Sequence, residues 1–292
     1  MDDEDDLAPG SLVRRWRLGK QLRELREAAG KNMTEAAKYI GLTQPTLSRI
    51  ETGKHAILPR NVRQLCQCYG IGAPLVDTLI RQAEEASDRG WWMTYSDTMP
   101  DWFETFVGFE TDASVIFIYE CELIPGLLQT ADFTRLIRAA QGPASEPELA
   151  KSVEFRQARQ QRLTSKPPEL HVVLNEAALR RPVGGPETMA AQIEHLISVA
   201  RQPWASIQIL PFRVGPHAGI KGPFMMLTLP GEAAPNMVYL EQDHGAIYLD
   251  RQSDLVRYAQ VFESLANTAL APTDSIEFMT TVEREYLGEQ KG

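Results

Sequence analysis

The chain has 292 residues, 43% hydrophobic and 24% charged, which is an ordinary globular composition and enough length for about two domains. No run approaches the roughly 18 consecutive apolar residues of a membrane span, and the acidic start MDDEDD is unlike a signal peptide, so we expect a cytoplasmic protein with no membrane partner. Three cysteines without Cys-x-x-Cys spacing argue against a metal site.

The formal net charge is −9, but the charge is unevenly distributed. Residues 1–10 form an acidic stretch that we expect to be a disordered tail. Residues 11–63 contain twelve Lys and Arg against four Asp and Glu, a local charge of +8, so the rest of the chain carries −17. A basic module on an acidic body points to a polyanionic partner for that module alone.

The basic module is predicted to contain five short helices. The first follows apolar residues at helical spacing and stops at Gly30. Asn32 and Glu35 have the spacing of a capping box that opens the second helix. The last two helices are expected over roughly residues 59–69 and 74–88. Short helices joined by a tight glycine turn are typical of a helix-turn-helix module.

The third helix has the clearest start and stop signals. Thr43 is suited to be its N-cap, and Pro45 is tolerated in the first turn because the N–H that it lacks would be unpaired there. Leu42 and Leu47 are spaced as a hydrophobic staple, and Gly53 ends the helix. We therefore expect a short, well-defined helix over these residues.

The second helix of a helix-turn-helix pair enters the major groove, where its first residues reach base edges. Gln44 can pair bidentately with adenine, and Arg49 with guanine O6 and N7. Thr46 or Pro45 can touch a thymine methyl group. The helix that starts at Thr43 is thus predicted to read DNA sequence, while the surrounding positive charge supplies affinity. A helical bundle that contacts only other proteins is the alternative.

Residues 18–53, LGKQLRELREAAG to GLTQPTLSRIETG, resemble the phage-repressor or XRE type of helix-turn-helix. The resemblance implies base reading by Gln44, Pro45 and Arg49, and a buried structural ion pair between Arg26 and Glu51. It also implies that the turn after the recognition helix contacts the DNA backbone. The residues expected to contact the backbone are Asn32, Thr43, Ser48, Thr52, Lys54, Arg17 and Arg60, with Arg14, Arg15, Lys20 and Arg63 as further basic candidates.

Residues 91–292 read as an α/β (α+β) domain with a mixed sheet, because β-branched runs alternate with helical patterns. The predicted strands are 114–120, 170–175, 206–212, 224–230, 236–242 and 246–250. The predicted helices lie near 130–140, 146–163, 186–201, 251–270 and 273–287. The expected organisation is therefore an acidic tail (1–10), a helix-turn-helix DNA-binding domain (11–90) and a domain for regulation, dimerisation and partner or ligand binding (91–292).

Three stretches carry a second resemblance: YECELIPGLLQT (119–130), LNEAALRRPVGGP (174–186) and LPFRVGPHAGIKGPF (210–224). They are similar to a domain of unknown function that follows such a module in many regulators of filamentous, antibiotic-producing bacteria. The resemblance implies developmental or antibiotic control, and many such regulators are encoded beside a small acidic partner protein. It implies no chemistry for the domain.

Candidate ligand-binding residues in this domain are few. His217 and Lys221 lie in a glycine-rich loop, but a phospholipase D-type site would want a repeated His-x-Lys, so we expect no catalytic residues and no enzyme. The loop is predicted to be a structural turn, or a ligand or partner loop. Glu176 is predicted to be a first-turn acid or a ligand contact. The pairs Trp91–Trp92 and Trp102–Phe103 could line a pocket, form a dimer seam or pack at the domain junction.

No P-loop or dinucleotide fingerprint is present, so no cofactor is expected. The leading hypothesis is a sequence-specific transcriptional regulator that binds double-stranded DNA as a homodimer, on half-sites about 34 Å apart, under control of its C-terminal domain. One alternative is an antitoxin-like protein that holds a small acidic partner. Another is a metabolite sensor whose larger domain binds a small-molecule effector.

Overall fold

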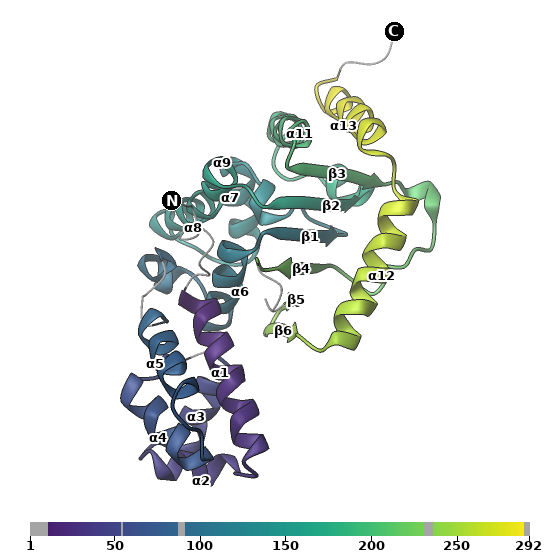
Figure 1. The fold of residues 1–292 in the computed structure, drawn as a ribbon. Helices are drawn as coiled ribbons and strands as arrows, with labels where there is room; N and C mark the ends of the chain where they lie inside the picture. Colours follow the sequence, from purple (N-terminus) through teal and green to yellow (C-terminus); the bar gives the residue numbers. More distant parts are fainter. Residues whose placement is uncertain (1–10, 54, 87–90, 231–235, 289–292) are drawn as a thin grey trace, which may run out of the picture. The chain divides into compact units, whose positions relative to one another are not determined.

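The computed structural model describes residues 11–53, 55–86, 91–230 and 236–288 (Figure 1). The chain divides into two compact units. The first comprises Met1–Thr94 and Glu104–Asp112, and the second comprises Tyr95–Phe103 and Ala113–Gly292. The expected acidic tail (1–10) and residues 87–90, next to the expected domain boundary, lie outside the described residues.

The first unit holds the five predicted helices. They are α1 (Ser11–Ala28), α2 (Met33–Tyr39), α3 (Gln44–Glu51), α4 (Pro59–Tyr69) and α5 (Leu75–Glu85). Their apolar faces meet in one core that includes Leu18, Leu22, Leu47, Ile50 and Leu65, each at most 3% exposed. The helical core predicted from apolar spacing is therefore confirmed.

Two elements at the start of the predicted second domain (91–292) were not expected from the sequence. A 3₁₀ segment, η2, covers Trp91–Thr98, and helix α6 covers Asp101–Asp112. The first three residues of α6 group with the second unit, and the remaining nine with the first. In the first unit, Phe109 of α6 meets the Trp16 ring edge-on, with centroids 5.8 Å apart. The helical unit is therefore larger than residues 11–90.

The second unit is built on a six-stranded mixed sheet in the order β3-β2-β1-β4-β5-β6 (Figure 1). The strands are β1 (Val115–Glu120), β2 (Glu169–Asn175), β3 (Ala205–Leu210), β4 (Phe224–Thr228), β5 (Asn236–Gln242) and β6 (Gly245–Leu249). Strands β1, β2 and β3 are parallel, and β4, β5 and β6 are antiparallel to their neighbours. All six predicted strands and the mixed sheet are confirmed.

Helices follow the strands of this unit closely. They are α7 (Ala131–Ala140), α8 (Glu146–Gln160), α9 (Arg162–Ser165), α10 (Glu176–Arg180), α11 (Pro186–Ala200), α12 (Gln252–Thr268) and α13 (Pro272–Tyr286), with 3₁₀ turns η3 (Gly126–Leu128) and η4 (Phe212–Val214). The predicted helix 146–163 is divided into α8 and α9. The short α10 is absent from the predicted helices, although Glu176 lies in its first turn, which was one of the two roles considered for this residue.

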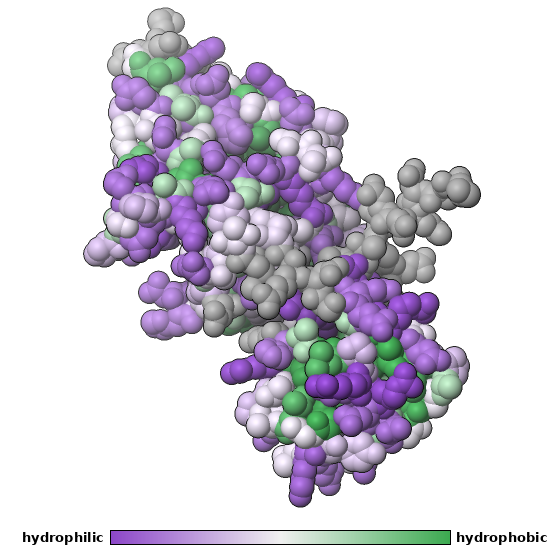
Figure 2. Space-filling view, turned by 90° about the vertical axis from the view of Figure 1, so that its left-hand side faces the viewer, coloured by the Kyte–Doolittle hydropathy of each residue, from purple (hydrophilic) through white to green (hydrophobic). Residues whose placement is uncertain are grey.

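Both sheet faces carry apolar residues, as parallel strands between helices require. Helix α12 covers one face through Phe262 and Leu265, which pack with Tyr119, Val173 and Phe224. The alternate strand residues, such as Ile118, Val172 and Ile207, share the other face and are at most 1% exposed. On the side drawn in Figure 2, hydrophilic residues (purple) cover most of the surface, with hydrophobic ones (green) in small groups between them.

Candidate nucleic-acid interface

Helix α3 has a locked N-terminus. Thr43 is its N-cap, with extended backbone angles (φ −83°, ψ 153°), and the Thr43 hydroxyl accepts a hydrogen bond from the Thr46 backbone N–H at 3.3 Å. The two threonine hydroxyls are themselves 2.8 Å apart. Pro45 lies in the first turn, where its fixed φ suits the helix. This start is rigid enough to present side chains in a fixed register.

The predicted base-reading residues differ in accessibility. Gln44 and Pro45 in the first turn are exposed, and so is Arg49 about one turn further along. Thr46 is half-buried, and its hydroxyl is engaged by Thr43. Gln44 and Arg49 are therefore the two side chains here that combine exposure with the bidentate donor and acceptor geometry of base recognition.

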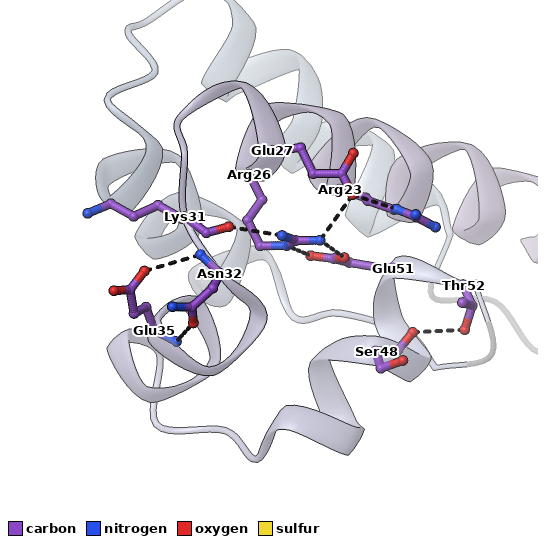
Figure 3. Close-up of polar contacts among 9 residues, drawn as sticks. All are labelled: Arg23, Arg26, Glu27, Lys31, Asn32, Glu35, Ser48, Glu51 and Thr52. Atoms are coloured by element: carbon purple, nitrogen blue, oxygen red, sulfur yellow. Dashed lines mark hydrogen bonds and ion pairs between the residues drawn. The ribbon is translucent and has the colours of Figure 1, made fainter.

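A buried ion pair joins α1 to the end of α3 (Figure 3). The guanidinium of Arg26 donates from Nε to Glu51 Oε1 at 2.7 Å and from Nη2 to Glu51 Oε2 at 2.9 Å. The Arg26 Nη1 group donates to the Lys31 carbonyl at 2.9 Å. Hydrogen bonding to Glu51 raises the pKa of Arg26. The pair fixes the C-terminal end of α3, as the cap fixes its start.

Gly19 and Gly53 let the backbones of α1 and α3 approach closely. Of these two, Gly19 was not singled out from the sequence. A Cβ atom on Gly19 of α1 would lie 2.3 Å from the Ile50 carbonyl oxygen of α3. A Cβ atom on Gly53 would lie 2.6 Å from Cα of Trp16, and Gly53 has a φ of 73°. Both positions require glycine, which sets α3 directly against α1.

The predicted backbone-contacting residues lie in varied surroundings. Asn32 is exposed and forms a capping box, accepting from the Glu35 N–H at 2.9 Å while its own N–H donates to Glu35 at 3.1 Å (Figure 3). Ser48 is half-buried, and its carbonyl accepts from the Thr52 hydroxyl at 2.8 Å (Figure 3). Arg60 at the start of α4 is exposed, whereas Lys54 lies outside the described residues.

The arginines near the start of α1 face acidic residues of α6. Burial lowers the pKa of Arg15, while Glu104 acts in the opposite direction. Burial likewise lowers the pKa of Arg17, which has Asp112 as its charge partner. Acidic residues of α6, a helix that was not predicted from the sequence, therefore partly offset the positive charge of Arg15 and Arg17. The spacing of Trp102, Phe106 and Phe109 in α6 was the available signal.

The weak candidates of the second unit all involve the loop that follows β3, which contains His217 and Lys221 and is bonded to Glu176. Glu176 accepts from Arg180 Nε at 2.6 Å and from the Phe212 N–H at 2.9 Å, so it anchors the loop that follows β3. His217, in that loop, packs on the ring of Tyr119 with centroids 5.8 Å apart. Lys221 is exposed. The contacts with Glu176 and Tyr119 hold this loop in place.

The structure describes residues 11–53, 55–86, 91–230 and 236–288. Within these ranges no group of three or more His, Cys, Asp or Glu is arranged to hold a metal ion, and no helix is long and apolar enough to cross a membrane. The three cysteines are free thiols, of which Cys66 is buried. Burial raises the pKa of Cys66, as expected for a structural thiol.

The comparisons with known proteins agree with both units. Residues 17–79 match a helix-turn-helix domain, which suggests a DNA-binding transcriptional regulator and a non-enzymatic role. Residues 103–281 match a domain of unknown function (DUF5753). No curated protein matches the chain. Because the second match covers more than half of the 292 residues, the chain belongs to the family of proteins with a DUF5753 domain, here preceded by a helix-turn-helix domain.

Proposed function

We propose that this protein is a sequence-specific transcriptional regulator, acting in the cytoplasm, that reads the major groove with α3. The observation that carries the proposal is the exposure of Gln44 and Arg49 on a helix held at both ends, by the Thr43 cap and by the Arg26–Glu51 pair. Base readout requires side chains that reach the groove from a rigid support. We assign adenine recognition to Gln44 and guanine recognition to Arg49.

Affinity is proposed to come from contacts with the DNA backbone. We assign this role to residues that lie near or follow the two helices of the motif: Asn32, Thr43, Ser48, Thr52, Lys54 and Arg60. Arg17 is a weaker member of the set because Asp112 offsets its charge. Backbone contacts add binding energy without adding sequence information, so their loss should weaken binding to all sequences alike.

A homodimer is part of the proposal, with residues 91–292 controlling the DNA-binding domain. One recognition helix touches too few base pairs for operator selectivity, and two copies on half-sites about 34 Å apart solve this problem. The antitoxin-like alternative, in which the chain holds a small acidic partner, stays a prediction. The sensor alternative is favoured by a cleft in the second unit, described below.

Two measurements on the full chain test the proposal. Selection from random DNA should enrich two copies of one short motif in inverted orientation, with centres about 10 base pairs apart. Sedimentation velocity of the complex should give two chains per selected site. Recovery of unrelated sequences, or of a single motif bound by one chain, would refute dimeric sequence recognition.

A further inference from the structure

The second unit contains a cleft of about 740 Å³, and its lining includes Trp102 and Phe103, for which lining a pocket was one of the roles considered. It is lined by the segment that enters α6, by α7 and α8, by Pro223 before β4, and by the end of β5. The side chains that define it chemically are Trp102, Phe103, Phe155, Arg138, Arg156 and Arg159. Its volume lies within the roughly 300–1,000 Å³ of small-molecule sites.

Arg159 is a buried cation that packs against the aromatic residues of the cleft. Arg159 is only 5% exposed, and its guanidinium carbon lies 5.1 Å from the ring centroid of Phe103 and 5.8 Å from that of Phe155. Trp102 extends this wall, with its ring edge-on to Phe103 at 5.7 Å. A cation shielded from water attracts an incoming anion more strongly than a surface cation does.

A second arginine is held in place by the turn η3. A Cβ atom on Gly126 would lie 1.7 Å from Arg156 Nη1, so the guanidinium occupies the space that a side chain there would take. The Gln160 amide donates to the carbonyls of Gly126 at 2.9 Å and Gln129 at 2.7 Å. These bonds tie α8 to η3, so the absence of a side chain at Gly126 positions Arg156 along the cleft.

Acidic residues at the end of β5 also line the cleft. Glu241 and Asp243 line the cleft, and the Tyr239 hydroxyl donates to Glu241 at 3.0 Å. Burial, assisted by Glu241, raises the pKa of nearby Glu120 to about 8, so Glu120 is mostly neutral at pH 7. The lining arginines Arg138, Arg156 and Arg159 come from α7 and α8, and the lining carboxylates Glu241 and Asp243 lie at the end of β5.

We propose that this cleft binds a small organic anion with a flat apolar body. The carboxylate or phosphate of the ligand contacts Arg156 and Arg159, and its apolar body packs on Trp102 and Phe103. The cleft suits an effector because these two aromatic residues lie in the first turn of α6, and Glu104–Asp112 of the same helix belong to the first unit. The role of the ligand as an effector rests on the proposed function, whereas ligand binding in the cleft does not.

The probe is 2-naphthoate, a flat aromatic carboxylate, compared with its uncharged analogue 2-naphthalenemethanol by calorimetric titration of the full chain. We expect naphthoate to bind about 10-fold or more tightly than the alcohol, because charged hydrogen bonds add that much. Arg156→Gln should abolish the preference. Arg201→Gln, an exposed arginine outside the cleft, should leave it unchanged.

A second variant covers the case in which Arg156→Gln does not fold. Gly126→Ala should displace only the mobile end of the Arg156 side chain, and so reduce the preference for naphthoate while the melting temperature changes little. Naphthoate should also increase hydrogen-exchange protection of residues 101–112 in the absence of DNA. Equal binding of acid and alcohol, no binding of naphthoate, or an unchanged preference in both variants would overturn the proposal. None of these readouts involves DNA, so failure of the site and failure of DNA recognition are seen separately.

Discussion

The Arg26–Glu51 pair allows a quantitative test of what holds α3 in place. The Arg26 and Glu51 side chains are only 8% and 2% exposed, and two hydrogen bonds join them. Glu51→Gln keeps the size of the side chain but removes the buried counter-charge of Arg26, and leaves Arg26 with the more exposed Glu27 carboxylate at 3.5 Å. Breaking one side of a buried pair costs about 3–5 kcal/mol. We therefore expect Glu51→Gln to lower the stability of the helical unit by about 3 kcal/mol.

The double variant Arg26→Met/Glu51→Leu, compared with the single variants Arg26→Met and Glu51→Leu, separates the interaction between the two side chains from the cost of burying each charge. Replacing both partners with apolar residues removes the unpaired charge, so it should recover most of the loss, with a coupling energy of about 2 kcal/mol or more. Native-state hydrogen exchange of the full chain, read in peptides from α1 and α3, measures the stability of this unit alone. A coupling energy near zero would show that the two side chains are not coupled in the folded protein.

Two further predictions concern the packing of each unit. Gly19→Ala should reduce hydrogen-exchange protection in α1 and α3, because the added Cβ would lie 2.3 Å from the Ile50 carbonyl oxygen. The control Gly72→Ala, whose Cβ would meet open space, should change this protection little. Equal effects of the two variants would refute the close approach of α1 and α3. Glu120 has its pKa raised from 4.5 to about 8 by burial and by Glu241, so its folded form holds a proton that the unfolded chain releases above pH 4.5. Its contribution therefore lowers stability as pH rises from about 5 to 8, with the loss complete above the folded pKa. Glu120→Gln should melt progressively higher than the unsubstituted protein across that range, and parallel pH profiles would contradict this.

Much of the helix-turn-helix was predictable because its signals are local. The Asn32–Glu35 capping box and the Thr43 cap each depend on residues within one turn, and the structure shows both. The six strands were equally clear from their apolar runs; β1, β2 and β3 are buried on both faces of the sheet, whereas β6 has no buried residue. Local hydrogen bonding and side-chain burial therefore determine most element boundaries in this chain.

The missed features depend on contacts between residues far apart in the sequence. Helix α6 was overlooked because its aromatic residues were interpreted as junction packing, and with it the acidic partners of Arg15 and Arg17. The cleft was not predictable because Trp102, Arg156 and Glu241 come from separate elements. Only one of the considered roles for Trp102–Phe103, lining a pocket, pointed towards it.

The measurement that tests the central claim most directly compares Arg49→Ala with Arg60→Ala. Fluorescence anisotropy would give the affinity of each full-length variant for the selected site and for a site in which the guanine assigned to Arg49 is replaced. The unsubstituted protein and Arg60→Ala should discriminate between the two sites by about 1–3 kcal/mol, with Arg60→Ala weaker on both. Arg49→Ala should bind both sites equally; full discrimination by Arg49→Ala would contradict base reading by α3.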